Sequence, residues 1–157
     1  IDGEPVTGDY EKYISEHLDE IACIEVRADC LAEVLDNGLR SGGDYLKRAL
    51  PEIRQLGREF YRQPDGGTWI RFEQMLQGLE WMAQLMRSIA ANPDCYANGA
   101  AYEPAALRLN AQIGGLNAAV ARRDAAFTGD LILHEIQPLL EDIEELINET
   151  MNAEVAV

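Results

Sequence analysis

Apolar residues recur every three or four positions along most of this chain, a spacing typical of amphipathic α-helices. The first such stretch begins at Asp9 and ends at Asn37-Gly38, a pair that is common at a helix C-terminus. The pattern therefore predicts a long N-terminal helix behind a flexible leader at residues 1–8. Its apolar stripe alternates steps of four and three, like a coiled-coil seam, at Tyr10, Ile14, His17, Ile21, Ile24, Ala28, Leu31 and Leu35.

Two more helices are predicted in the middle of the chain. One runs from about Asp44, a suitable N-cap behind two glycines, to Arg62. Pro51 either kinks this helix or follows a short turn as its first residue. After a loop at residues 63–67, the next helix is expected to start near Thr68, a second suitable cap, and to end at about Ala91.

The last two predicted helices each contain an unusual residue. One runs from Pro104 to about Arg123 with Gly114-Gly115 inside it, and each glycine costs roughly 1 kcal/mol relative to alanine. We therefore expect either the close approach of a neighbouring helix there or a ligand that needs access to the backbone. The final helix begins at Asp124 or at Asp130, and Pro138 should bend it.

These elements predict an all-α fold. No segment alternates with the period of two that marks a strand, and most connections are short, which favours antiparallel neighbours. We expect an up-and-down antiparallel bundle of four to five helices, with a long N-terminal helix and a Pro-bent C-terminal helix. Residues 9–157 would form a single domain, because a chain of 157 residues is of ordinary one-domain size.

The charge balance excludes several classes of partner. Acids outnumber bases 28 to 13, which gives a formal net charge of −15. Such a chain would not displace counterions from nucleic acid and would be repelled by anionic membranes, so neither is expected as a partner. An odd number of cysteines, Cys23, Cys30 and Cys95, with no C-x-x-C pair indicates reduced thiols and a cytoplasmic location.

The charges are also unevenly distributed. The first and last segments are acidic, whereas basic residues are concentrated on the second predicted helix. Because like-charged neighbours repel, we expect the second helix to lie beside an acidic one. Solvated faces without specific pairing are the alternative. The basic residues in question are Lys47, Arg48, Arg54, Arg58 and Arg62.

Candidate chemistry is sparse. Neither histidine stands in a Glu-x-x-His motif, because Ile14 precedes His17 and Leu131 precedes His134 by three positions, so we expect no metal and no cofactor. Asp130 lies four residues before His134, with Glu135 next to it. Asp130 and His134 could form a proton-transfer pair, or they could be a helix-start Asp and a nearby surface or interface His; Glu135 is a further candidate.

Two tryptophans are the remaining candidates. Trp69 and Trp81 lie at the edges of the third helix's apolar face and could line a pocket or an interaction groove. Aromatic residues at helical spacing are more often part of the core. The sequence predicts no catalytic residue, because it contains no nucleophile, phosphate-binding or dinucleotide-binding motif.

Several short motifs resemble a family of small uncharacterised helical proteins from Gram-positive bacteria. The resemblance covers roughly residues 38–150. It implies a helical bundle in a bacterial cytoplasm, and it implies no reaction and no functional residues. The motifs are Gly43-Asp44-Tyr45-Leu46, Leu50-Pro51-Glu52-Ile53, Phe72, Gly78-Leu79-Glu80-Trp81-Met82, and Gly129-Asp130-Leu131 followed by Glu135, Pro138 and Leu139.

The sequence thus favours a non-enzymatic module that binds another protein or itself, with a homodimer as one outcome. A surplus of apolar helix face over what one core can bury would drive that association. The alternative is a protein or enzyme with an inter-helix pocket near Gly114 and Asp130 for a small, cationic ligand. A third reading, an acidic regulator of a basic partner, rests on charge alone. The candidate interaction or pocket residues are Trp69, Trp81, Gly114, Gly115, Asp130, His134 and Glu135.

Overall fold

The computed structural model describes residues 31–155. The chain divides into two units, Ile1–Cys30 and Leu31–Val157, and the described residues belong to the second. The predicted leader at residues 1–8, and the part of the predicted first helix that precedes Leu31, lie outside the described residues.

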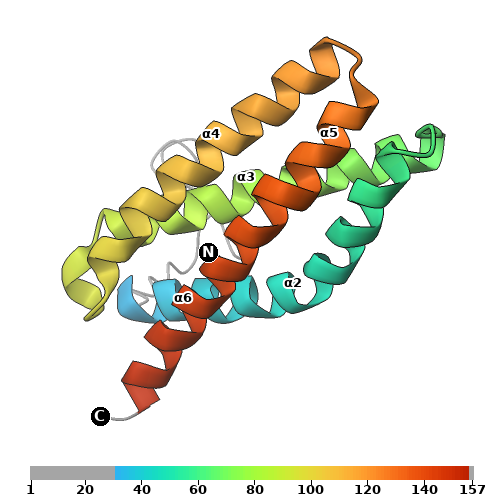
Figure 1. Cartoon of the computed structure of the whole chain (residues 1–157). Coiled ribbons are helices and arrows are strands. Elements are labelled where there is room, and N and C mark those ends of the chain that lie inside the picture. The colour runs from blue at the N-terminus through green and yellow to red at the C-terminus, as the bar shows by residue number, and fades with distance from the viewer. Residues whose placement is uncertain (1–30, 156–157) are drawn as a thin grey trace, which may run out of the picture. The chain divides into compact units, whose positions relative to one another are not determined.

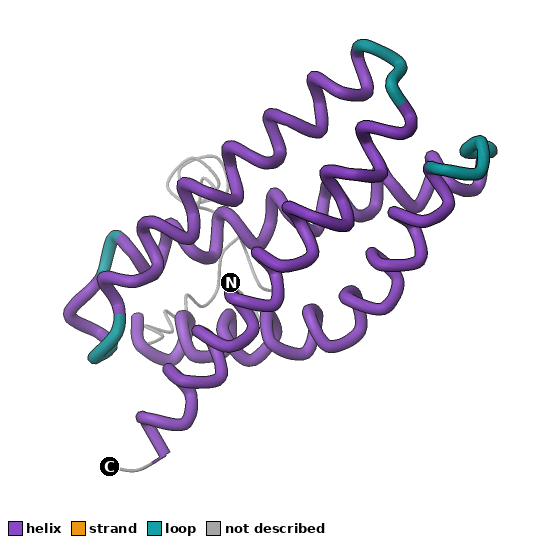
Figure 2. Tube along the Cα trace, in the orientation of Figure 1, coloured by secondary structure: helices purple, strands orange, loops and turns teal. Residues whose placement is uncertain are grey.

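All regular structure in residues 31–155 is helical, which confirms the predicted all-α class (Figure 2). Short 3₁₀ turns at Pro93–Cys95 and Gly99–Ala101 form the connector before α4, and a π-helical turn at Ile132–Ile136 joins α5 to α6. The α-helices of this part of the chain are α2 (Leu31–Phe60), α3 (Gly66–Ala90), α4 (Tyr102–Ala121), α5 (Ala125–Leu131) and α6 (Gln137–Val155).

The helices of this unit pack in an up-and-down arrangement (Figure 1). Helix α2 packs against α3 on one side and against α5 and α6 on the other, while α4 packs against α3 and α5. The predicted stripes face the interior, where Leu46, Leu79, Leu109 and Ile136 are completely buried. Because these stripes repeat with the helical period, packing four rods side by side removes most of their side chains from water, although Leu31 at the start of α2 stays half exposed.

The predicted break between the first and second helices is wrong. Helix α2 runs without interruption through Asn37-Gly38 and through the two glycines before Asp44. Gly42 is buried, and a Cβ atom on it would lie 3.0 Å from a methyl of Leu85, so it allows close packing of α3 rather than ending a helix. Pro51 also lies inside α2, on its exposed side.

The N-cap of α3 lies three residues before the predicted one. Asp65, not Thr68, is the N-cap, and its Oδ1 accepts a hydrogen bond of 2.8 Å from the backbone N–H of Thr68. This is the usual capping geometry, in which an acidic side chain pairs with a free amide of the first turn. Similarly, α4 begins at Tyr102, so Pro104 is its third residue rather than its first.

Of the two starts predicted for the last helix, the structure selects the first. Asp124 caps α5 by accepting a hydrogen bond of 2.9 Å from the Phe127 N–H. The distortion expected from Pro138 takes the form of the π-helical turn, in which the Gln137 N–H donates to the Ile132 carbonyl, five residues back. Pro138 has no N–H for the His134 carbonyl, and the wider turn accommodates this loss.

A buried polar contact links the start of α4 to the C-terminal part of α6. The hydroxyl of Tyr102, which is completely buried, lies 2.5 Å from Thr150 Oγ1. The Thr150 hydroxyl in turn lies 3.0 Å from Asn98 Oδ1 and 2.8 Å from the Leu146 carbonyl. This cluster fixes the connector and the end of α6 to the start of α4. Burial raises the pKa of Tyr102 to about 12.

Candidate functional site

The predicted acid–base residues lie along the junction of α2 with α5 and the π-helical turn. The side chain of Asp130 accepts a short hydrogen bond from the Tyr61 hydroxyl. This bond, followed by partial desolvation and the negative charge of Asp130, raises the pKa of Tyr61. Asp130 is thus hydrogen-bonded to the phenol of Tyr61, the residue that follows α2, rather than to the imidazole of His134.

Glycines bring the backbones together at this junction. A Cβ atom on Gly57 would lie 2.6 Å from Leu133 Cγ, and one on Gly129 would lie 2.9 Å from the Gly57 carbonyl oxygen. Helix α2 and the α5 segment therefore approach more closely than side chains would allow. The junction is filled by this contact and by Ile132, which is completely buried.

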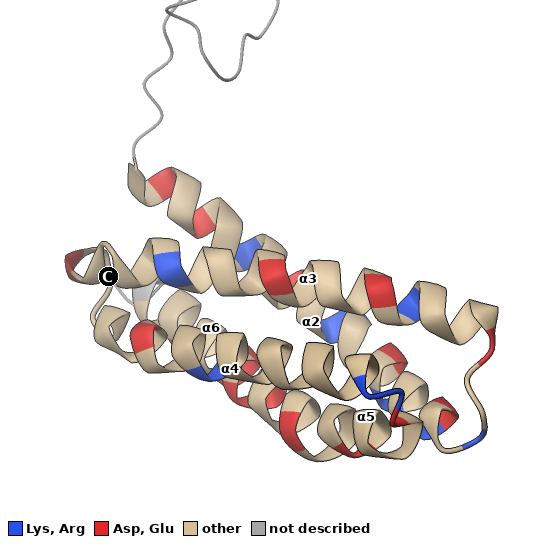
Figure 3. Ribbon diagram, turned by 90° about the horizontal axis from the view of Figure 1, so that it is seen from above, with Lys and Arg blue, Asp and Glu red and all other residues tan. Residues whose placement is uncertain are grey.

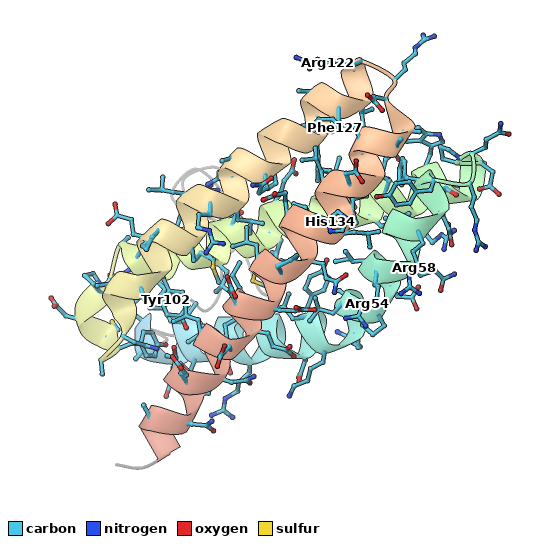
Figure 4. The ribbon with its side chains drawn as sticks, in the orientation of Figure 1. Arg54, Arg58, Tyr102, Arg122, Phe127 and His134 are labelled. Atoms are coloured by element: carbon cyan, nitrogen blue, oxygen red, sulfur yellow. The ribbon has the colours of Figure 1, made fainter. Side chains whose placement is uncertain are left out.

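His134 and Glu135 lie on the outer side of the π-helical turn, and both are exposed. Figure 4 shows His134 beside the part of α2 that carries Arg54 and Arg58. Glu135 accepts a long hydrogen bond of 3.5 Å from Gln112 of α4. The predicted trio is therefore spread along a surface.

The predicted neighbourhood of basic and acidic helices is present. Arg54 of α2 forms an ion pair of 3.4 Å with Glu141 of α6, and Arg108 of α4 pairs with Asp142 at 3.4 Å. Half of the Arg54 side chain remains exposed, so water screens this pair. Such pairs contribute little stability but favour the observed placement of α2 beside α6.

The expectation of a closely packed helix at Gly114 is wrong. Gly114 is exposed, and a Cβ atom built on it would meet no atom within 4 Å. Gly115 is half-buried, with Leu131 Cδ1 at an ordinary contact distance of 3.9 Å from such a Cβ. Gly114 lies instead on an outward line of small or apolar α4 residues with Leu107, Ala111 and Ala118, all exposed.

The two tryptophans have different environments. Trp69 is half-buried and makes edge-to-face contacts with Phe60 and Phe72, with ring centroids 5.2 and 5.7 Å apart. Its place is therefore with the core. Trp81 is 41% exposed and rests edge-on against Tyr45 at 6.1 Å. It presents a large aromatic surface to solvent.

Trp81 belongs to an uncharged line on the outward side of α3. The members are spaced by alternating steps of four and three, all are exposed, and Ile70 is exposed to 60%. We call this line the α3 outer face. It consists of Ile70, Gln74, Gln77, Trp81, Gln84 and Ser88.

The α3 outer face contrasts with the outward sides of α2 and α6. The exposed residues of α6 include Glu141, Asp142, Glu145 and Glu149, and α2 exposes a mixture of both signs. In Figure 3 the charged positions of α3 are separate bands with uncharged ribbon between them. In an acidic chain, such a line allows another surface to approach without desolvating charges.

Sequence reasoning missed Ile70 and the regularity of this face. The signal is present in the sequence as six uncharged residues at helical spacing. It is easily overlooked because only Ile70 and Trp81 are apolar, and because the stronger stripe at Phe72, Leu79 and Met86 on the opposite side of α3 dominates the pattern. Tyr61 was missed because its partner Asp130 is 69 residues away.

Two further observations concern the described residues as a group. Within residues 31–155, no group of three or more His, Cys, Asp or Glu side chains is arranged so that it could hold a metal ion. None of the helices described has the length and apolar character required to span a bilayer.

The fold and its surfaces thus define a small, all-helical bundle with an acidic surface and an uncharged outer line on α3. Residues 37–146 match a family described as a domain of unknown function (DUF8042), and the chain belongs to this family. The match lies almost wholly within residues 38–150, where the resemblance to an uncharacterised helical family was recognised. No curated protein and no solved structure matches the chain.

Proposed function

We propose that this domain is a non-enzymatic interaction module that associates with itself through the α3 outer face. The observation that supports this proposal is the exposure of Trp81 and Ile70 on a line without charges, in a chain of net charge −15. Aromatic residues are enriched at the centres of protein interfaces, and charged residues are depleted there. The cytoplasmic location and bacterial origin implied by the resemblance belong to the same proposal.

The charge of the chain limits where two copies can meet. Docking through the outward side of α6 would bring Glu141, Asp142 and Glu145 against other acidic residues, and like charges in close contact are repulsive. The α3 outer face itself carries no charged residue, so the centre of an interface formed there would be free of this repulsion. Its Gln side chains can both donate and accept hydrogen bonds, so they can pair with their counterparts on a second copy.

The interface would be small. A stable interface commonly buries about 800 Å² on each partner, and one helix face with two large apolar side chains offers less than that. We therefore expect weak association that depends on protein concentration. The wild-type chain should show a rising average mass across a concentration series in sedimentation equilibrium.

Placing a charge on the α3 outer face tests the proposal. Ile70→Glu should weaken self-association by at least about tenfold, because the substitution would bury a carboxylate in the interface. Ile70 is 60% exposed, so the substitution should leave the fold intact. Sedimentation velocity measures the dimer fraction, and circular dichroism checks helicity.

Leu107→Glu is the matched control, since Leu107 is 65% exposed on the outward side of α4. This variant should self-associate like the wild type. A wild-type chain that stays monomeric at all concentrations would overturn the proposal. So would a loss of association in Leu107→Glu but not in Ile70→Glu, because it would place the interface on α4.

A further inference from the structure

The spacing along the α3 outer face constrains how a second copy can dock. The residues of this face are separated by alternating steps of four and three, which is the spacing of the two seam positions of a coiled coil. Most of the residues at these positions are polar here, whereas a coiled-coil seam is usually apolar. The first of these positions is held by Gln74, Trp81 and Ser88, and the second by Ile70, Gln77 and Gln84. When two such seams run antiparallel, each residue of the first set lies opposite a residue of the second set on the other copy. Trp81 then lies opposite Gln77 of the second copy, Gln74 opposite Gln84, and Ile70 opposite Ser88.

One edge of the α3 outer face carries charges at intervals of seven residues. These are Glu73, Glu80 and Arg87, all exposed. Arg87 Nη1 donates a hydrogen bond of 3.1 Å to Asn110 Oδ1, which holds the guanidinium at the edge toward α4. In an antiparallel pair, this edge faces the same edge of the other copy in reverse. Glu73 then faces Arg87 twice, and Glu80 faces Glu80 once.

The opposite edge of the face offers no such partners. Its positions are Arg71, Gly78 and Leu85. The Arg71 guanidinium is hydrogen-bonded to Glu59, the Tyr45 hydroxyl covers Gly78, and Leu85 is buried against α2. A parallel pair would set the charged edge of one copy against this edge and would leave Glu73 and Glu80 without basic partners.

We propose that two copies of this chain dock antiparallel through the α3 outer face, with Glu73 of each copy paired to Arg87 of the other. This inference rests on the proposed function and adds the partner's orientation and the residues that select it. The charged pairs lie at the rim, where they determine orientation and partner choice more than affinity.

Charge reversal at the two positions tests the orientation. Glu73→Arg alone, or Arg87→Glu alone, replaces two attractions with two repulsions and should weaken self-association about five- to tenfold at low salt. An equimolar mixture of the two single variants, and the double variant Glu73→Arg/Arg87→Glu, should each recover wild-type affinity. The recovery should shrink as ionic strength rises.

Glu80→Gln provides a second, independent measurement. It removes the like-charge contact at the two-fold axis and should strengthen the dimer about two- to threefold. Sedimentation equilibrium at several concentrations gives the dissociation constant of each variant. Circular dichroism confirms that each variant is folded.

The results separate the inference from the function on which it rests. If the wild type self-associates and Ile70→Glu prevents this, but neither the mixture nor the double variant recovers affinity, the antiparallel arrangement is wrong and the proposed function stands. A Glu80→Gln variant with unchanged or weaker association would also contradict the arrangement. A strictly monomeric wild type would overturn both.

Discussion

Glycines have opposite roles at different positions of this molecule, and the role of each depends on what surrounds it in the fold. Gly57 and Gly129 lie where two backbones meet, while Gly114 faces open solvent. The sequence predicted close packing at Gly114 because a double glycine in a helix interior normally has a packing reason. Gly57 and Gly129 do serve this purpose, but each stands without a neighbouring glycine in the sequence and gives no such signal.

Tyr102 gives the clearest prediction for a single residue. Tyr102→Phe removes the hydroxyl that contacts Thr150 and should lower the free energy of unfolding by about 1 kcal/mol at neutral pH. The cost is limited because the Thr150 hydroxyl keeps its contacts with Asn98 and Leu146. Urea unfolding measures the difference between the variant and the wild type.

The same variant has a definite pH dependence. The pKa of Tyr102 is raised in the folded protein, so its contribution to stability is fully present below the unfolded value of 10.0 and is lost as the pH rises toward about 12. The free energy of unfolding of the wild type should therefore fall faster across this range than that of Tyr102→Phe. The stability advantage of the wild type over the variant should shrink accordingly. A constant difference over the whole range would show that the phenol is not buried in the folded protein.

At the scale of helices, the sequence located the elements but not all of their boundaries. The apolar stripes predicted the buried sides of α2 to α6 because burial follows periodicity. The break predicted near Gly42 was wrong because a glycine pair has the same appearance at a helix end and at a helix crossing. The π-helical turn was not foreseen, since Pro138 predicts a distortion without specifying its form.

Two glycine variants test the helix packing with a matched pair. Gly57→Ala should destabilise the domain by about 1–3 kcal/mol, because the new Cβ would lie 2.6 Å from Leu133 Cγ where α2 packs tightly against the π-helical turn. Gly114→Ala should instead stabilise it by roughly 0.5–1 kcal/mol, because the methyl enters open space in a helix. Thermal and urea unfolding report both changes. Equal effects of the two substitutions would be incompatible with this packing.

At the scale of the whole molecule, the charge pattern predicted which helices are neighbours but did not identify the exposed uncharged face of α3. The basic character of the second predicted helix correctly placed α2 beside the acidic α6, as the Arg54–Glu141 pair shows. The α3 outer face could not be assigned from the sequence, because an exposed and a buried uncharged position look alike until the packing is known. Only the exposure of Ile70 and Trp81 reveals that α3 has a second, outward line.

The central claim is that copies of this chain meet through α3, and backbone amide NMR spectra recorded over a range of protein concentrations test it most directly. We predict that concentration-dependent shifts will gather at Ile70, Gln77, Trp81 and Gln84, while the amides of α6 from Glu141 to Glu149 stay in place. Shifts confined to α4 or α6, or spectra that do not change with concentration, would contradict the claim.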